Sequence, residues 1–339
     1  MRLSTLSKLN IPIICGPTAS GKSAVAIAVS QTINSEILSI DSTQVYRDFN
    51  IGSAKPTPNE LKIVKHHLID QVDPNQQYNI AQFIKDADEV LLQAATNGSK
   101  IIGVGGSSLY LTSLLHGIAS LPPANQPLRE QLEGFQNEEL WEKLKMLDPQ
   151  KAARLAINDR LRVIRSLEIA SSGVSSPKKD NITNSMATYG HPRYSALLIV
   201  LCLKRDELYS RINERAKNMI DNGLLEESAA LLKKYPKAPP LKSLGYAQCV
   251  ESIRKKQGSD KKLLINSIAQ KTRNYAKRQI TFWRNEPKKR GWNIIIGRSY
   301  EEPALYSHQE VLELIKKSIS IPKLESHQRV ELAYIAIKS

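Results

Sequence analysis

Residues 16–23 constrain the fold of this chain more than any other segment. They match the phosphate-loop pattern G-x-x-x-x-G-K-[ST], in which backbone N–H groups surround a diphosphate, a lysine neutralises it and a hydroxyl binds Mg²⁺. An apolar run precedes the pattern and an apolar-rich stretch follows it. This strand–loop–helix context puts the positive end of a helix dipole at the anion site and disfavours a chance glycine-rich turn. The sequence therefore predicts that the chain binds a di- or triphosphate. The candidate phosphate-binding residues are Gly16, Pro17, Thr18, Ala19, Ser20, Gly21, Lys22 and Ser23.

Short apolar runs recur along the chain as candidate buried strands, and helical periodicity fills most of the gaps between them. The clearest helical stripe runs through residues 80–94, with Asn79 as a possible N-cap and Gly98 beyond its end. Strands that alternate with helices predict an α/β fold, a parallel sheet flanked by helices as in phosphate-loop NTPases. The five predicted strands are residues 11–15, 36–40, 100–104, 195–203 and 292–296.

Roughly ninety residues separate the third and fourth predicted strands, far more than one crossover requires. Helical patterns at residues 138–147 and 159–171 are followed by a polar stretch without periodicity, residues 175–192. We interpret residues 119–194 as a helical insertion domain; the alternative is a set of peripheral helices without a separate function. The core then comprises residues 1–118 and 195–320. Residues 321–339 form a tail to which the sequence assigns no role. Pro322 interrupts the preceding helix, and the last residues could form one more short element.

The chain is basic, with 48 Lys and Arg against 33 Asp and Glu among 339 residues. A net charge of +15 can simply aid solubility, but eight basic residues cluster within residues 271–290, where Glu286 is the only acid. Such a cluster indicates a polyanionic partner, most plausibly nucleic acid. At ~100° per residue, Arg273, Lys277 and Arg284 share one side of a helix, a candidate contact surface for a phosphate backbone. Tyr275 and Phe282 share the opposite side, so we expect them in the core.

Cysteine usage and hydropathy indicate a reducing, non-membrane setting. Cys15, Cys202 and Cys249 are far apart and none belongs to a C-x-x-C pair, which argues against disulfides and a zinc site. No apolar run approaches the ~18–20 residues that span a bilayer. A cleaved secretory signal would remove the phosphate loop. We therefore expect a cytoplasmic protein without a membrane partner.

Polar side chains follow the second and third predicted strands, where sites of open α/β sheets form. Asp41 could hold Mg²⁺ through water, act as a general base or cap a helix, and spacing alone does not choose. Ser107 follows two glycines and would present a hydroxyl at the same edge, although a serine cap explains it nearly as well. No strand ends in a second acid, which counts against a motor-type ATPase.

Two further groups have a functional and a structural interpretation. Arg211 and Arg215 lie four residues apart on one predicted helix, where one of them could reach the diphosphate or both could be solvated. His66 and His67 lack other ligands at metal spacing, so we expect them to form structural hydrogen bonds.

Taken together, these residues resemble the tRNA dimethylallyltransferase (tRNA isopentenyltransferase) family. Six or more separate signatures in one order make the resemblance specific, and it spans most of the chain. The absence of clustered cysteines excludes the appended zinc finger of eukaryotic relatives, so the bacterial form is closer. The matching segments are residues 16–23, 41–44 with Tyr46, 51–56, 66–70, 105–110, 161–165 with Leu167 and Glu168, 242–246 and 272–281.

The resemblance implies prenyl transfer: dimethylallyl diphosphate donates its five-carbon group to N6 of adenosine 37 of a tRNA, and pyrophosphate leaves. Asp41 would accept the proton from N6. Lys22, Ser23, Ser107 and Arg215 would stabilise charge on the leaving group, and Ser23 would hold the Mg²⁺ cofactor. The base would flip out of the anticodon loop, and the insertion domain and basic helix would grip the stem of the anticodon stem-loop. We expect a monomer.

By the same resemblance, tRNA-binding residues lie in the D-S-x-Q segment, the insertion domain, the G-Y segment and the basic helix. They are Asp41, Ser42, Thr43, Gln44, Arg162, Arg165, Lys242, Gly245, Tyr246, Arg273, Lys277, Arg278 and Arg284.

The chain departs from the family pattern at a few positions. Ser107 stands where the family usually has Thr, and the hydroxyl is retained. Leu161 and Ala247 stand where relatives carry Gln and Arg, which removes two tRNA contacts. The Phe282-Trp283 pair reorders the usual aromatic spacing. These changes concern tRNA affinity and leave the chemistry intact.

Three rival functions use the same loop. An adenylate prenyltransferase would act on a free nucleotide, which needs neither a helical insertion nor a basic helix. A phosphate-loop kinase would require nucleotide-base and lid signatures that are missing. A non-enzymatic RNA-binding protein would not need intact Lys22, Ser23 and Asp41.

Overall fold

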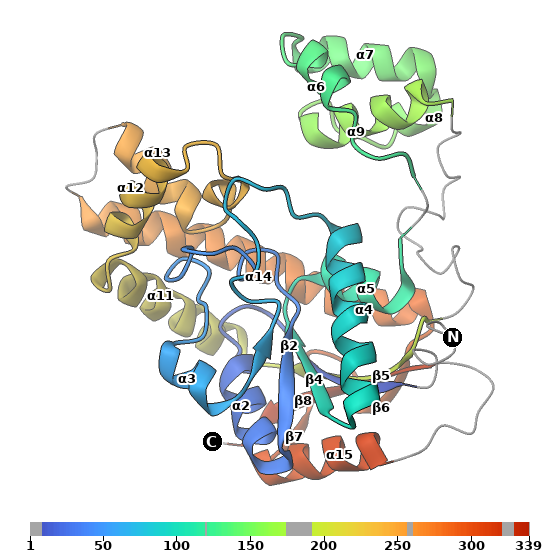
Figure 1. Ribbon diagram of the computed structural model, residues 1–339, viewed down its shortest axis with the longest axis vertical. Coiled ribbons are helices and arrows are strands. Elements are labelled where there is room, and N and C mark those ends of the chain that lie inside the picture. The colour runs from blue at the N-terminus through green and yellow to red at the C-terminus, as the bar shows by residue number, and fades with distance from the viewer. Residues whose placement is uncertain (1–8, 119–120, 174–191, 256–259, 321–328, 339) are drawn as a thin grey trace. The chain divides into compact units, whose positions relative to one another are not determined.

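The computed structural model describes residues 9–118, 121–173, 192–255, 260–320 and 329–338. The chain divides into two compact units, one formed by Met1–Gly117 with His191–Ser339 and the other by Ile118–Gly190 (Figure 1). Most of the polar stretch expected between residues 175 and 192 lies outside the described residues.

The larger unit is built on an eight-stranded sheet whose ladders are all parallel. Its order is β3-β2-β4-β1-β5-β8-β6, and β7 pairs with β8 beside β6. Because the strands run parallel, the loops after β1, β2 and β4 emerge at one edge of the sheet. The strands are β1 (Asn10–Cys15), β2 (Ser35–Ser39), β3 (His66–His67), β4 (Lys100–Gly105), β5 (Ser195–Leu201), β6 (Asn293–Ile296), β7 (Ala304–Tyr306) and β8 (Val330–Ile337).

Helices cover both faces of this sheet (Figure 1). The core on one face contains side chains of α2 (Lys22–Ile33) and α15 (His308–Ser320). The core on the other face contains side chains of α4 (Ile80–Asn97), α5 (Ser108–His116) and α14 (Lys261–Arg290). This second core extends through helices that follow β5. The unit also contains a short helix after residue 56. These helices are α11 (Arg205–Asp221), α12 (Leu224–Lys234), η1 (Pro239–Lys242), α13 (Tyr246–Arg254) and, after residue 56, α3 (Pro58–Ile63).

Local signals set the ends of these helices. Asn79 caps α4 by accepting a hydrogen bond from the Gln82 N–H, and Gly98 ends it at φ 71°. Both assignments confirm the sequence prediction. Asp260 caps α14, which continues through a buried Pro287 in its last turn and ends at Gly291.

The smaller unit is helical and contains its own core. Apolar side chains of the four helices among its described residues pack together in it, including Leu140, Leu144 and Val163, each fully buried. The predicted helices at residues 138–147 and 159–171 are confirmed as α7 and α9. The helices are α6 (Gln126–Leu132), α7 (Asn137–Leu147), α8 (Pro149–Ala152) and α9 (Arg160–Ser171).

The five strands expected from the sequence are present as β1, β2, β4, β5 and β6, with ends shifted by one or two residues. The tail contributes the further short element that the sequence left open. Residues 330–337, to which the sequence assigned no role, form β8 between β5 and β6, where Leu332, Ala333 and Ile335 are fully buried. The core therefore includes this part of the tail. Pairing with β5 and β6 places the strand inside the sheet, and its side chains enter the cores on both faces.

No helix among the described residues is long and apolar enough to cross a membrane.

Candidate functional site

The phosphate loop connects β1 to α2 in a conformation that its glycines permit. Gly16 has φ 135°, and a Cβ there would lie 2.7 Å from the Leu201 carbonyl oxygen, so only glycine fits. Gly21 caps α2 at φ 89° without a side-chain hydrogen bond, which leaves the first N–H groups of the helix available to an anion. The Lys22 ammonium bends back and donates to the Pro17 carbonyl over 2.6 Å.

Gln279 of α14 joins the phosphate loop to the turn after β4. Its Oε1 accepts from the Thr18 N–H at 2.9 Å, and its Nε2 donates to the Gly106 carbonyl at 2.7 Å. The side chain is buried, with 4% of its surface exposed. Sequence reasoning gave Gln279 no role, because nothing in a helical segment signals that a side chain bridges two distant loops.

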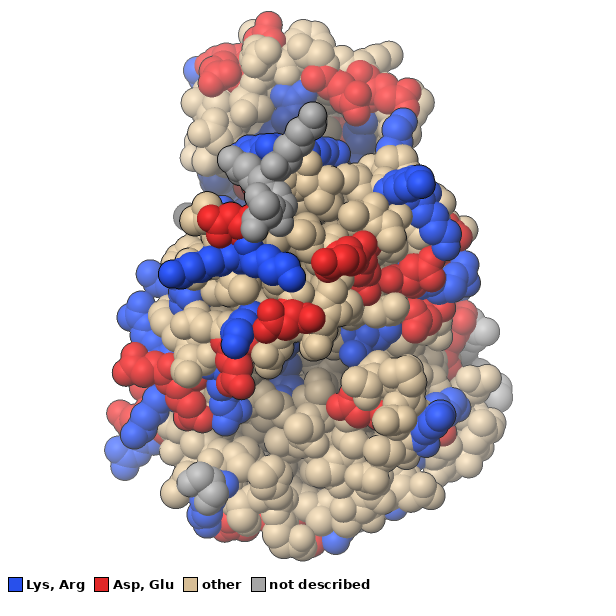
Figure 2. All heavy atoms as spheres, turned by 90° about the vertical axis from the view of Figure 1, so that its left-hand side faces the viewer, with Lys and Arg blue, Asp and Glu red and all other residues tan. Residues whose placement is uncertain are grey.

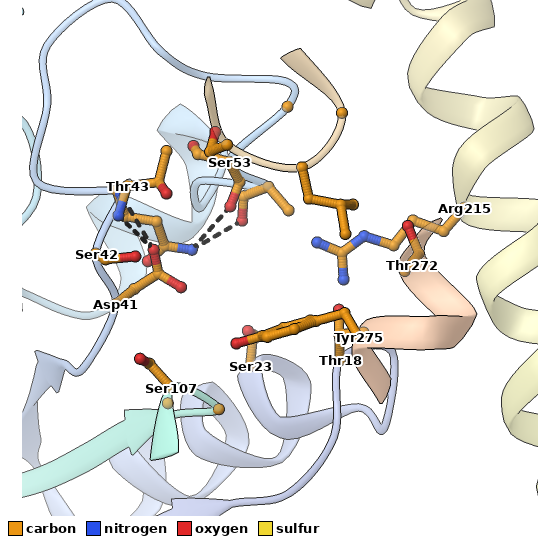
Figure 3. A pocket seen from close by; sticks show the side chains of 18 of the residues that line it. Thr18, Ser23, Asp41, Ser42, Thr43, Ser53, Ser107, Arg215, Thr272 and Tyr275 are labelled. Carbon is orange, nitrogen blue, oxygen red and sulfur yellow. Dashed lines mark hydrogen bonds between the residues drawn. The ribbon is translucent and has the colours of Figure 1, made fainter. Parts of the chain in front are cut away.

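A cavity of about 610 Å³ opens above the phosphate loop and receives side chains from the ends of three strands and from α11 and α14. Asp41, Ser107 and Arg215 all line it, as do Lys22 and Ser23. In the view of Figure 3, Asp41 and Ser107 lie on one side, and the Arg215 guanidinium extends into the cavity from the opposite side. The structure thus brings together the residues that the sequence analysis proposed for the chemistry.

Two of the cations that line the cavity, Lys22 and Arg215, form no ion pair with an acid among the described residues. The Arg215 guanidinium forms no hydrogen bond or ion pair there, and Lys22 forms no ion pair. Burial, and then the nearby Arg215 charge, lower the pKa of Lys22 to about 8. Burial also lowers the pKa of Arg215, although the Asp41 charge opposes this. An anion in the cavity would stabilise both charges.

Asp41 is oriented by its own backbone. Its Oδ1 accepts hydrogen bonds from the Thr43 N–H at 2.8 Å and the Gln44 N–H at 3.2 Å. Among the described residues, Oδ2 has no hydrogen-bond partner, so it is available to a ligand in the cavity. This geometry suits a fixed proton acceptor.

Hydroxyl groups of the loop fit a diphosphate with a divalent ion. Ser20 Oγ is buried and has no hydrogen-bond partner within the described structure. The Ser23 hydroxyl lines the cavity, and no hydrogen bond to another described residue occupies it. Oxygen donors beside substrate phosphates are the usual setting of Mg²⁺. The backbone cradle, the unpartnered hydroxyls and the two cations therefore fit a Mg²⁺-diphosphate.

Tyr275 occupies the cavity, whereas the sequence prediction placed it in the core. Its half-buried ring lies over the phosphate-loop side of the cavity, and the Arg278 guanidinium lies 5.7 Å from the ring centroid (Figure 3). Burial raises its pKa to about 12. The prediction that Tyr275 lies in the core was wrong, because the side of α14 that carries Tyr275 faces the cavity. Phe282 packs against the core, as expected.

The remaining residues expected to bind tRNA differ in how available they are. Ser42, Lys242 and Arg278 line the cavity and are exposed, and Thr43 lines it as well. Tyr246 is instead fully buried, with its hydroxyl bonded to Glu227, so its side chain offers no surface to RNA. Gly245 is buried too but contributes backbone to the cavity lining.

Gln44 is engaged within the protein. Its Oε1 accepts from Ser39 Oγ at 2.9 Å, and its Nε2 donates to the Ser53 and Ala54 carbonyls at 3.3 and 3.1 Å. Its side chain therefore holds loops together, and both of its polar atoms are already hydrogen-bonded where the residue lines the cavity.

The basic side of α14 is divided in the same way. Arg273 donates to Asn213 of α11 and Gln270. Arg284 is exposed and pairs with Glu301, and Lys277 is exposed. Figure 2 shows Lys and Arg interleaved with Asp and Glu on the face that carries α11 and α12. Positive charge on this face is therefore distributed and not gathered in one patch.

Two of the predicted tRNA-binding arginines lie in the helical unit. Arg162 is exposed and pairs with Asp159 at 3.4 Å. Arg165 donates to the Pro122 and Pro123 carbonyls at 2.5 and 3.4 Å and to Glu168 at 3.0 Å. It therefore connects α9 to the segment that precedes α6.

The two histidines form the structural hydrogen bonds that were expected. His66 Nδ1 bonds to the Val64 carbonyl at 2.7 Å, and His67 Nε2 bonds to Glu36 at 2.5 Å. His66 also lines the cavity.

Known proteins share both the sequence and the architecture of this chain. A family model described as IPP transferase matches residues 44–286. A tRNA dimethylallyltransferase of Myxococcus xanthus is 41% identical over 283 residues, 82% of this chain and 90% of that protein. One of Chloroherpeton thalassium is 38% identical over 93% of this chain and 98% of that protein. The crystal structure of a tRNA delta(2)-isopentenylpyrophosphate transferase from Staphylococcus epidermidis superposes with a TM-score of 0.61 at 29% identity, covering 92% of this chain and 99% of that one.

Proposed function

The chain belongs to the IPP transferase family, and from that premise we propose that it is a tRNA dimethylallyltransferase. It transfers the dimethylallyl group of dimethylallyl diphosphate to N6 of adenosine 37 in a tRNA and releases pyrophosphate. The observation that carries this proposal is the shared cavity: an anion cradle with two cations lacking acidic partners lies beside a carboxylate with a free oxygen.

The residues divide into those that bind the leaving group and one that accepts a proton. The phosphate loop, Lys22 and Arg215 bind the diphosphate, and the Ser107 hydroxyl lies at the same edge. The adenine N6 attacks C1 of the donor, a C–N bond forms, and the C1–O bond breaks with its electron pair passing to pyrophosphate. Asp41 Oδ2 takes the proton that N6 loses. Cations aimed at the leaving group lower the barrier because negative charge grows there as the bond breaks.

Mg²⁺ fits the residues of the loop and is part of the proposal. Ser23 would hold it together with diphosphate oxygens. When bound, the ion neutralises charge on the leaving diphosphate. Ser20, whose buried hydroxyl lacks a partner, would donate to a phosphate oxygen.

For the tRNA, we propose that the anticodon loop reaches the cavity over its exposed polar margin. Ser42, Lys242 and Arg278 are exposed there, and Lys277 is exposed on the same helix as Arg278. Residues 119–194 act as an insertion domain that grips the anticodon stem, with Arg162 among its exposed cations. We further propose that the protein works as a monomer in the cytoplasm.

A transfer assay tests the function. Protein, Mg²⁺ and radiolabelled dimethylallyl diphosphate are incubated with bulk tRNA or with AMP, and label is expected in tRNA only. Label in AMP and not in tRNA would identify an adenylate prenyltransferase, and label in neither would exclude prenyl transfer to both.

Asp41→Ala tests the assigned base. Turnover should fall about 100-fold or more, because a positioned proton acceptor contributes ~10²–10⁴-fold. Binding of tRNA, measured by filter retention, should stay nearly unchanged. Loss of tRNA binding in this variant would mean that Asp41 positions the RNA instead.

A further inference from the structure

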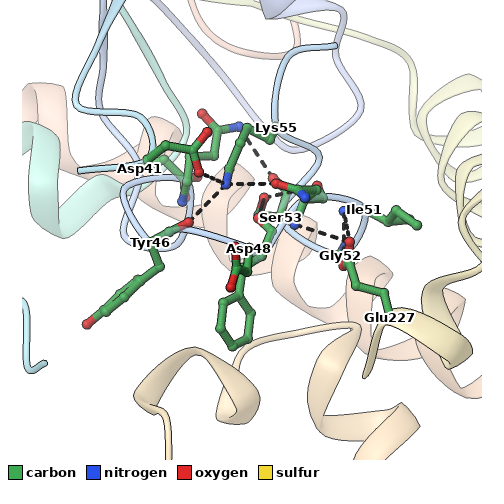
Figure 4. Close-up of polar contacts among 12 residues, drawn as sticks. Asp41, Tyr46, Asp48, Ile51, Gly52, Ser53, Lys55 and Glu227 are labelled. Carbon is green, nitrogen blue, oxygen red and sulfur yellow. Dashed lines mark hydrogen bonds and ion pairs between the residues drawn. The ribbon is translucent and has the colours of Figure 1, made fainter. Parts of the chain in front are cut away.

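A second carboxylate, Glu227 of α12, binds a row of backbone N–H groups in the loop that follows Asp41. Its two oxygens accept hydrogen bonds from the Asn50 N–H at 3.3 Å, the Ile51 N–H at 3.0 and 3.1 Å, and the Gly52 N–H at 3.4 Å (Figure 4). Glu227 was not among the residues that sequence reasoning selected, because it lies on a helix far along the chain from this loop.

Tyr246 completes this contact from α13. Its buried hydroxyl donates to Glu227 Oε1 at 2.5 Å and accepts from the Gly52 N–H at 3.1 Å. A Cβ on Gly52 would lie 2.5 Å from the Tyr246 ring, so the loop lies directly against it. The ring is fixed in turn by an edge contact with Phe49, at 5.0 Å between centroids.

The loop needs such anchors because cavities lie on two sides of it. Residues 52–54 and Pro56 line the cavity with the phosphate loop, while residues 50–51 and 54–58 line a second cavity of about 680 Å³. Lys55 holds the far end: its Nζ, 4% exposed as a side chain, donates to the Tyr46 carbonyl at 2.9 Å and pairs with Asp70 at 2.5 Å. Phe49 and Ile51 pack against the core, whereas polar contacts hold the part of the loop that lies between the two cavities.

The loop is linked to Asp41 through Gln44. The Ser53 and Ala54 carbonyls accept from Gln44 Nε2, and the Gln44 N–H donates to Asp41 Oδ1. A shift of residues 50–54 would therefore shift the turn that orients the Asp41 carboxylate.

We propose that Glu227, bridged by Tyr246, is a positioning residue for the proton-accepting carboxylate of Asp41. The expected loss of transfer rate rests on the proposed function. The expected shift of the Asp41 turn rests on the hydrogen bonds alone. A carboxylate suits this place because it only accepts, and every group facing it donates. Glutamine would turn an amide donor toward these donors.

The test is a double-mutant cycle between Glu227→Gln and Asp41→Ala, with Glu226→Gln as the matched control. Glu226 is the exposed neighbour on the same helix. Under single-turnover conditions, Glu227→Gln should slow transfer to tRNA by about 10- to 100-fold, the effect of displacing a reacting group by about 1 Å. The KM for dimethylallyl diphosphate should not move, because the phosphate loop is untouched. In the Asp41→Ala background the same change should have little further effect. Glu226→Gln should behave as wild type.

Tyr246→Phe provides a milder variant that keeps the buried ring and should show the same pattern with a smaller loss. Equal losses in the Asp41 and Asp41→Ala backgrounds, or no loss in either variant, would overturn the proposal. Hydrogen exchange separates this outcome from failure of the proposed function. Glu227→Gln should speed exchange of the amides of residues 41–46, and unchanged exchange there would refute the positioning role even if the wild-type protein transfers nothing to tRNA.

Discussion

Two arginines of the helical unit and one arginine of the sheet unit stand in opposite electrostatic situations. In the helical unit, the Glu168 carboxylate, 1% exposed as a side chain, pairs with Arg129 at 2.7 Å and Arg165 at 3.0 Å. In the sheet unit, Arg215 and Lys22 line the cavity, and neither forms an ion pair with a described residue. A cation that already has its partner stabilises the fold, whereas a cation without one is held ready for a ligand of opposite charge.

The largest expected effect separates these two roles at Arg215. Arg215→Met should lower the transfer rate by about 100- to 1000-fold, because it removes a charge aimed at the leaving group. The free energy of unfolding should stay equal or rise, since a buried cation without a partner destabilises the fold. Turnover and chemical denaturation of the same preparation measure both.

Arg211 provides the matched control, one turn earlier on α11. It pairs with Glu207 at 2.8 Å, and both side chains are about half exposed. Arg211→Met should change the free energy of unfolding by no more than about 1 kcal/mol and leave turnover nearly unchanged. Equal losses of activity in Arg215→Met and Arg211→Met would contradict the distinction between a partnered and an unpartnered cation.

A smaller effect is expected from the titration of Lys22. Its pKa of about 8, lowered by burial and by Arg215, means that the ammonium loses its proton as the pH rises through 8. Affinity for dimethylallyl diphosphate should therefore fall above pH 8, by up to about tenfold per pH unit. Calorimetry between pH 7 and pH 9.5 measures it. Lys22→Arg keeps its charge over this range and should bind with an affinity that is flat with pH; a flat profile in the wild type would contradict the account.

The smallest effect on chemistry, and a clear one on stability, is expected at Glu168. Glu168→Gln leaves Arg129 and Arg165 without their carboxylate, and about 1–3 kcal/mol of stability should be lost from the helical unit. Hydrogen exchange in α9 measures this loss, and binding of dimethylallyl diphosphate should not change. Loss of diphosphate binding would show that the cations of the two units are not independent.

The same carboxylate predicts a pH dependence for the helical unit. Burial raises the pKa of Glu168, but hydrogen bonds from Arg129 and Arg165 outweigh it, and the pKa lies below its ordinary value of 4.5. A lowered acid pKa stabilises the fold above the ordinary value, and this contribution is lost as the pH falls through the lower one. The protection factors of the α9 amides, which relate the measured exchange to the intrinsic rate at each pH, should therefore fall below pH 4.5 in the wild type and change less with pH in Glu168→Gln.

Much of this arrangement could be predicted from the sequence, because its signals are local. The phosphate loop, Asp41 and Ser107 each follow an apolar run, and a parallel sheet brings the ends of such strands to one edge. The two ends of α4 could likewise be predicted, because Asn79 and Gly98 lie directly beside the helical pattern that they cap.

The features that could not be predicted depend on partners distant in the chain. Strand β8 is buried only because β5 and β6 flank it, and the run of residues 330–337 does not reveal those neighbours. Gln279 and Glu227 act across 173 and 177 positions, respectively, on backbone groups that carry no sequence signature. Tyr275 has a helical phase consistent with a core, and only the packing of α14 shows that it faces the cavity.

The central claim is that the phosphate loop holds the leaving group of a prenyl donor. Nuclease digestion and mass spectrometry of tRNA after one turnover test it most directly, with pyrophosphate measured in the same sample and no ATP present. We predict that one adenosine gains one dimethylallyl group in place of a hydrogen for each pyrophosphate released, and that Asp41→Ala slows both by the same factor. Pyrophosphate release without a modified adenosine, or a requirement for ATP, would contradict the account.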